Sequence, residues 1–276
     1  MSVQNLPRFR RPYGVFLRIR FLNGLQYRAA ALGGLVTQFF WGGLTICLYA
    51  AFYRSDAAAF PMTFPQLVNY IWLQQAFLAL FFVWQNDNEI FDCISSGQVA
   101  YELCRPWDLY GMWFARNAAH RLSSAALRCV PVLLVAALLP APYGLTAPAS
   151  WQAFLCGLLS GVLGFLVVVA FGMLLYIATF YTLSPLGLRI AVSALSEFLS
   201  GGLIPLPFLP DGVRQVVNLL PFASMQNAPF LIYSGSVTGP AILSTMALQC
   251  FWLGILFLVG RLLMRRTLRR VVVQGG

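Results

Sequence analysis

The chain has 276 residues, of which 59% are hydrophobic and only 9% are charged. Soluble domains carry about 25% charged residues, so this composition excludes an ordinary soluble protein. The net charge of +10 comes from 18 basic residues, all of them arginine, against eight acidic ones. Because the phosphate-binding loop of many ATPases needs a lysine, a chain without lysine is expected to leave ATP binding to a partner.

Six apolar stretches are expected to cross the membrane as helices, since about 20 apolar residues span the hydrocarbon. They cover residues 29–53, 67–84, 122–139, 151–181, 190–204 and 241–263. Sixteen arginines fall on one side of these spans, which leaves only Arg54 and Arg214 for the other. Short arginine-rich loops stay in the cytoplasm, so both termini are expected there. The arginines flank spans, which favours anchoring at an anionic leaflet over nucleic-acid binding.

The N-terminal segment, residues 1–28, is expected to be cytoplasmic and to contain an amphipathic helix lying along the membrane surface. Val15, Ile19 and Leu22 can share one helical stripe there. Residues 29–264 then form a single all-α membrane domain, and residues 265–276 form a basic cytoplasmic tail. No soluble domain is expected.

The fifth expected span is the least like a simple helix. It reaches Gly201–Gly202, and prolines at 205, 207 and 210 then interrupt the chain before a short amphipathic helix. Irregular backbone at membrane depth persists only when it packs in protein or lines a wet cavity, so we expect a re-entrant segment here. The alternative is an ordinary short span followed by an outer loop.

Glu197 is the one acidic residue inside an expected span. A carboxylate in hydrocarbon is costly, and such residues generally face a cavity or a partner. Glu197 could bind a cationic group, line an exit gate or carry a proton. It could equally serve the structure by accepting hydrogen bonds from the broken backbone that follows.

Small residues recur at close spacing in the fourth expected span, at Gly157, Gly161 and Gly164. This spacing lets two membrane helices approach closely, either within the chain or between subunits. The single histidine and six scattered cysteines show no metal-ligand spacing, so no metal site is expected. No catalytic motif is present, which argues against an enzyme.

Two segments together resemble the signatures of a bacterial branch of the ABC type 2 (ABC-2) permease family. Residues 97–111 read GQVAYELCRPWDLYG, with Val99 where leucine is common, and residues 197–210 read EFLSGGLIPLPFLP. With six spans and inside termini, the similarity covers nearly the whole chain. It implies the permease subunit of an ATP-driven exporter, in which two such subunits pair above two separate ATPase subunits. ATP and magnesium would then bind to those partners, and this chain would hold no cofactor.

The resemblance also assigns roles to particular residues. The cytoplasmic stretch after the second span would carry the coupling helix, which passes ATPase motion to the spans. The expected coupling residues are Glu89, Asp92, Gly97, Glu102 and Arg105. The expected residues of the substrate path or gate are Glu197, Gly201, Gly202 and Pro205. The alternative for the coupling charges is that they are merely solvated in a connecting loop.

The expected function is export of a hydrophobic or amphipathic compound, such as a cationic drug-like molecule, across a bacterial inner membrane. The second permease subunit would be the same or a similar chain. The alternative is an ion-coupled secondary transporter that uses Glu197 as its proton or cation site, although such folds commonly show broken helices in both halves. A third interpretation is a membrane scaffold that transports nothing.

Overall fold

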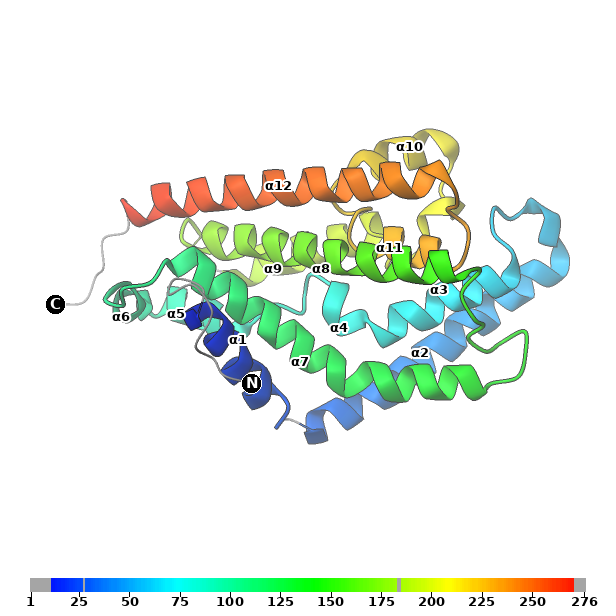
Figure 1. Ribbon diagram of the computed structural model, residues 1–276, viewed down its shortest axis with the longest axis horizontal. Coiled ribbons are helices and arrows are strands. Elements are labelled where there is room, and N and C mark those ends of the chain that lie inside the picture. Colours follow the sequence, from blue (N-terminus) through cyan, green and yellow to red (C-terminus); the bar gives the residue numbers. More distant parts are fainter. Residues whose placement is uncertain (1–10, 27, 183–184, 271–276) are drawn as a thin grey trace.

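Figure 1 shows an elongated bundle of helices in the computed structural model, which describes residues 11–26, 28–182 and 185–270. All regular secondary structure in these ranges is helical. The elements are α1 (Arg11–Gly24), α2 (Arg28–Ser55), η2 (Ala57–Ala59), α3 (Phe64–Ala76), α4 (Leu78–Phe81), α5 (Asn88–Ser95), α6 (Val99–Leu103), α7 (Leu109–Leu138), α8 (Trp151–Thr179), α9 (Pro185–Leu199), η3 (Leu206–Phe208), α10 (Asp211–Leu219), α11 (Asn227–Tyr233) and α12 (Pro240–Leu268).

Four helices in the described ranges are long and apolar enough to cross a membrane: Gly33–Ser55 within α2, and the whole of α7, α8 and α12. This confirms an integral membrane protein with several spans. The helix that contains the third expected span begins at Leu109, well before residue 122, because Asp108 caps it. The Asp108 carboxylate accepts a hydrogen bond from the Gly111 N–H at 3.1 Å.

The expected second span, residues 67–84, is not one continuous helix. It is interrupted at Phe77, and the four-residue α4 follows. The carbonyl oxygens of Leu80 and Phe82 accept hydrogen bonds from the buried Arg121 guanidinium at 3.1 and 2.7 Å. The stretch contains no proline or glycine, so no local breaker ends α4, and a donor from another helix satisfies the carbonyls that are freed there. Its crossing of the membrane stays a prediction.

The fifth expected span overlaps the 15-residue α9, which begins at Pro185, ends at Leu199 and is followed by a Schellman motif. The Gly202 N–H donates to the Glu197 carbonyl at 2.8 Å, and the Gly201 N–H donates to the Phe198 carbonyl at 3.3 Å. Gly201 has φ +78°, a conformation that favours glycine. The chain then continues through η3, α10 and α11, and its re-entrant placement stays a prediction.

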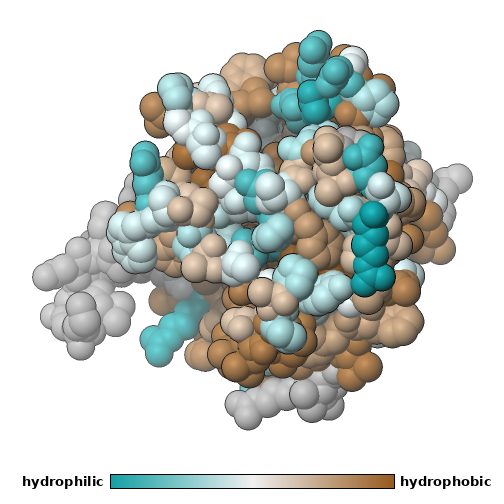
Figure 2. Space-filling view, turned by 90° about the vertical axis from the view of Figure 1, so that its right-hand side faces the viewer, coloured by the Kyte–Doolittle hydropathy of each residue, from teal (hydrophilic) through white to brown (hydrophobic). Residues whose placement is uncertain are grey.

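The two ends of the bundle differ in charge. α5 and α6, the start of α7 and the end of α12 lie together at one end, where Arg105 and the arginine cluster of α12 are found (Figure 1). Arg54 closes α2 and Arg214 lies in α10, both towards the other end. Seen from that second end, hydrophilic and intermediate residues cover much of the face and hydrophobic ones gather at the flanks (Figure 2). Arg8 and Arg10, used for the orientation, lie outside the described residues.

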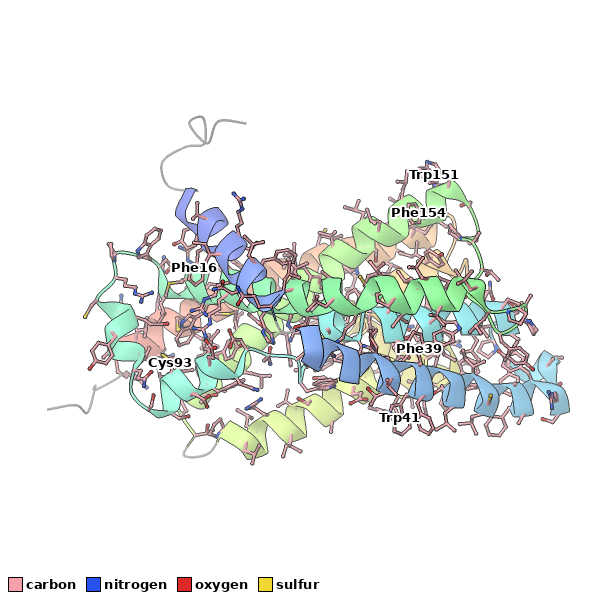
Figure 3. All side chains as sticks on the ribbon, turned by 90° about the horizontal axis from the view of Figure 1, so that it is seen from below. Phe16, Phe39, Trp41, Cys93, Trp151 and Phe154 are labelled. Atoms are coloured by element: carbon pink, nitrogen blue, oxygen red, sulfur yellow. The ribbon has the colours of Figure 1, made fainter. Side chains whose placement is uncertain are left out.

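α2 and α9 leave much of their apolar surface uncovered. Trp41 points away from the bundle in Figure 3, whereas Phe39 packs on Trp72 with ring centroids 6.4 Å apart. Such faces are normal where helices contact lipid or another subunit. At the C-terminus, α12 extends to Leu268, past the expected start of the tail at residue 265. Residues 1–10 and 271–276 of the expected terminal segments lie outside the described ranges.

Candidate functional site

The first candidate site lies at the end of the bundle that holds α5 and α6. Asp87 caps α5 by accepting a hydrogen bond from the Glu89 N–H at 3.0 Å. Phe91 of α5 is buried, while Asp92 is exposed. Gly97 has φ +74°, which lets the chain turn between α5 and α6. The segment is therefore a packed pair of short helices rather than a loose loop.

Arg116 of α7 binds three acidic residues, two at the start of α5 and one in α6. Its Nε donates to the Asp87 carboxylate at 2.7 Å, Nη2 donates to Glu89, and Nη1 lies 3.8 Å from the Glu102 carboxylate. The side chains of Arg116, Asp87 and Glu102 are only 6%, 10% and 15% exposed. Buried charges are tolerated when paired, and removing one partner costs about 3–5 kcal/mol. We call Asp87, Glu89, Glu102 and Arg116 the Arg116 cluster; it ties α5 and α6 to a membrane-spanning helix.

The polar contacts continue from the Arg116 cluster into the bundle. Arg121 is fully buried and donates to the Asn86 side-chain oxygen at 2.8 Å and to that of Asn117 at 3.3 Å. The same guanidinium holds the end of α4. The segment that precedes α5 is therefore fixed to α7 along its length.

A separate contact joins α5 to α9. Arg189, in the first turns of α9, donates to the Asn88 side-chain oxygen, and its Cζ lies 4.2 Å from the centre of the Phe91 ring. Hydrogen bonding and the cation–π attraction both favour this contact. A movement of α5 can thus reach the helix that carries Glu197.

The outward surface of this end is exposed and rich in aromatic and charged groups. Tyr101 is 77% exposed, and Arg105 and Trp107 are also exposed. The Arg105 side chain forms no ion pair with any described residue. Aromatic residues and arginine are enriched in protein interfaces, so this surface is suited to a protein partner.

The second candidate site lies where α9 ends, towards the other end of the bundle. The Tyr70 hydroxyl lies 3.1 Å from the Gly201 carbonyl oxygen and 3.2 Å from Asn227 Oδ1. Gln74 donates to the Gly202 carbonyl. A Cβ on Gly201 would come within 2.5 Å of the Tyr70 hydroxyl oxygen. We call Tyr70, Gln74, Gly201, Gly202 and Asn227 the neutral network, because only uncharged groups hold the broken backbone there.

Glu197 and Pro205 flank this network. Glu197 is partly exposed and forms no ion pair within the described ranges, and Pro205 is buried immediately before η3. α9 leaves Leu186, Ile190 and Leu195 more than half exposed. A carboxylate on a helix of this kind favours water or a partner over lipid.

The closely spaced glycines of α8 lie against the short helix α11 and the turn before it. A Cβ at Gly157 would be 3.5 Å from Tyr233, and one at Gly161 would be 3.9 Å from Pro229. At Gly164 a Cβ would be only 2.1 Å from the Met225 carbonyl oxygen. The close approach made by these glycines is therefore within the chain.

An apolar cavity of about 480 Å³ lies beside α11 and between α7 and α8. Leu134 and Leu158, both 60% exposed, line it together with the buried Phe81 and Phe230. Phe154 also lines it, at the end where α7 and α8 diverge (Figure 3). Such walls favour apolar groups over water.

The expected coupling residues therefore lie in different structural environments. Glu89 and Glu102 meet at Arg116, Gly97 forms the turn, and Asp92 and Arg105 stay on the surface. Sequence reasoning missed Arg116, Arg121 and Arg189 as members of the site. The sequence does carry a signal for Arg116 and Arg121. Asp108 is a suitable N-cap for a helix, and polar residues at 116, 117, 120 and 121 would share one face of that helix.

One comparison with known proteins gives a match. A family model described as "ABC-2 family transporter protein" matches residues 39–275. No curated protein and no solved structure is detectably similar to the chain.

Proposed function

Since the chain belongs to the ABC-2 transporter family, and is therefore a membrane permease component of an ABC transporter, we propose that it works in an ATP-driven exporter. Two ATPase subunits bind ATP and magnesium and dock on the exposed surface of α5 and α6. That end, with both termini, lies in the cytoplasm of a bacterial cell. The arginine distribution supports this orientation.

The Arg116 cluster is the observation that carries the proposal. A docking surface transmits force only when it is fixed to the element that must move, and Arg116 fixes α5 and α6 to α7 through three carboxylates. Arg189 provides a second route, from α5 to α9. ATPase movement at the surface would then change the position of the spans, so that the path opens alternately to the two sides of the membrane.

The path is proposed to run beside α9, between this chain and a second permease subunit of the same or a similar kind. Support comes from the uncovered apolar face of α9, from Glu197, which has no ion pair among the described residues, and from the backbone break at Gly201, Gly202 and Pro205. Glu197 suits a cationic group on the cargo, and the uncovered apolar face of α9 suits its hydrophobic part. A hydrophobic or amphipathic compound is therefore the proposed substrate class.

Assembly with the ATPase tests this proposal directly. The full-length chain is co-expressed with the ATPase subunit and purified through a tag on the chain. Arg105→Glu reverses a charge on the docking surface and is expected to reduce recovery of the ATPase about tenfold, as rim and surface charges govern association. Arg54→Glu, at the opposite end, is the matched control and is expected to leave recovery unchanged.

Two results would overturn the proposal. One is equal ATPase recovery with Arg105→Glu, Arg54→Glu and the unchanged chain. The other is transport by the purified chain alone that follows a proton gradient and ignores ATP, which would favour an ion-coupled transporter with Glu197 as its site.

A further inference from the structure

A second cavity, of about 680 Å³, lies between α1, the segment leading into α5, and α7. Its α7 wall includes four polar residues at a spacing of four: Arg116, His120, Ser124 and Arg128. Residues four apart share one face of a helix, so this stripe extends about 18 Å along the axis. α1, which carries Phe16, lies across α7 in Figure 3 and contributes Arg20, Asn23 and Gly24 to the opposite wall.

The two ends of this cavity differ in charge. The two carboxylates of its lining, Asp87 and Glu89, are both held by Arg116, and Glu89 also lies 3.4 Å from Arg20. At the other end, Arg128 forms no ion pair within the described part of the chain, and its Nε atom is buried without a hydrogen-bond partner there. One guanidinium of a polar cavity is thus left without a counter-charge.

Arg128 lies beside the start of the apolar stretch of α2, where we expect α2 to enter the membrane. The apolar stretch of α2 begins at Gly33, and a Cβ on the adjacent Gly34 would lie 2.8 Å from the Arg128 Cζ. This boundary between hydrocarbon and water is where phospholipid headgroups are found. A neutral hydroxyl, that of Ser124, lines the same part of the cavity, whereas the Ser123 hydroxyl already donates to the His120 carbonyl at 3.0 Å.

We propose that the Arg128 end of this cavity binds a phosphate group, and that the phosphate belongs to a phospholipid headgroup. A guanidinium can pair with two phosphate oxygens at once, which satisfies its unpaired N–H groups. Free phosphate would offer the same oxygens but no acyl chains. Val15, Ile19 and Leu22 of α1 are about half exposed and form an apolar surface beside which such chains can lie. The inference needs α2 and α7 in the membrane and is independent of the exported compound.

The test uses the full-length chain, purified in detergent and stripped of bound lipid. Native mass spectrometry follows titration with phosphatidylglycerol and with a diacylglycerol that has the same chains but no phosphate. Arg128→Gln is expected to weaken phosphatidylglycerol binding about tenfold, since it removes charge-assisted hydrogen bonds. Arg128→Lys keeps the charge but loses the two-oxygen contact, so its affinity for phosphatidylglycerol is expected to lie between those of the unchanged chain and Arg128→Gln. The matched control is Arg265→Gln, an exposed arginine of α12, with unchanged binding expected.

Three outcomes would overturn the inference. Both Arg128 variants could bind phosphatidylglycerol as tightly as the Arg265→Gln control. Diacylglycerol could bind as tightly as phosphatidylglycerol, which would make the phosphate irrelevant. Inorganic phosphate could occupy the site while phosphatidylglycerol does not, which would reject a lipid as its source. Arg128→Lys keeps the test valid if Arg128→Gln fails to fold.

Discussion

The Arg116 cluster fixes two short helices to the long helix α7, and the neutral network fixes the chain after α9 to α3 and α11, with different chemistry. The Arg116 cluster uses a buried arginine and three carboxylates. Asp87 and Glu89 lie 29 and 27 residues before Arg116 in the chain, and Glu102 lies closer to it. The neutral network uses hydroxyl and amide groups that contact the backbone of two glycines. We infer that charge controls the first site and backbone shape controls the second. Substitutions that remove charge should therefore affect the first site, and substitutions that add a Cβ should affect the second.

The largest effect is expected from Arg116→Met. It leaves the Asp87 and Glu102 carboxylates buried without their cation, at a cost of about 3–5 kcal/mol in the free energy of unfolding. Thermal unfolding of the purified chain in detergent measures the change. Arg265→Met removes an exposed arginine and is the control, with an expected effect below about 0.5 kcal/mol. Equal melting temperatures for the two variants would show that the cluster does not hold α5 and α6.

The next largest effect is expected from Gly201→Ala. The positive φ and the nearby Tyr70 hydroxyl together should cost about 1–3 kcal/mol. The double variant with Tyr70→Phe removes the hydroxyl, so its loss should be smaller than the sum of the single losses. Gly254→Ala is the control, because a Cβ there meets nothing within 4 Å. Strictly additive losses would mean that the hydroxyl and the glycine do not interact.

Arg189→Gln is expected to have a smaller effect on stability and a clear one on coupling. Loss of an accessible cation–π contact costs about 0.5–1 kcal/mol, while α5 loses its contact with α9. In proteoliposomes with the ATPase subunit, ATP hydrolysis should persist and ATP-driven efflux of a fluorescent hydrophobic cation should fall. Arg269→Gln, at the exposed end of α12, is the control. Hydrolysis and efflux falling in the same proportion would argue against a coupling route through α9.

Glu197→Gln should have the smallest effect on unfolding, within about 0.5 kcal/mol, because the side chain has no ion pair in the described ranges. Efflux is expected to change selectively. The cationic probe should leave more slowly, and a neutral probe of the same shape should leave at an unchanged rate. If both probes slow equally, Glu197 serves the structure of the break rather than cargo recognition.

The contrast between the two sites also explains what the sequence could predict. Long apolar runs and proline punctuation are local signals, and they predicted α8, α12 and the irregular chain after Gly201. The Arg116 cluster depends on contacts between segments that are separated in the sequence. Its acidic residues were therefore expected as charges that face a partner protein, and not as partners of one arginine. The end of α4 has no local breaker in the sequence, and the carbonyls of Leu80 and Phe82 there are satisfied by Arg121 from another helix. Family membership was expected from two signature segments and is confirmed by the match over residues 39–275.

Native Cys104 offers the most direct test of the central claim that α5 and α6 face an ATPase in the cytoplasm. Cys104 is exposed beside α6, whereas Cys93 is buried in α5. Burial and the nearby Glu102 raise the pKa of the Cys93 thiol, which keeps it protonated and unreactive.

The measurement is labelling with a membrane-impermeant maleimide in a variant that keeps Cys93 and Cys104 and has serine at the other four cysteines. We predict rapid labelling of Cys104 alone in inside-out vesicles, none in right-side-out vesicles, and protection when the ATPase subunit is bound. Labelling from the outer side, or labelling that the ATPase subunit leaves unchanged, would contradict the account.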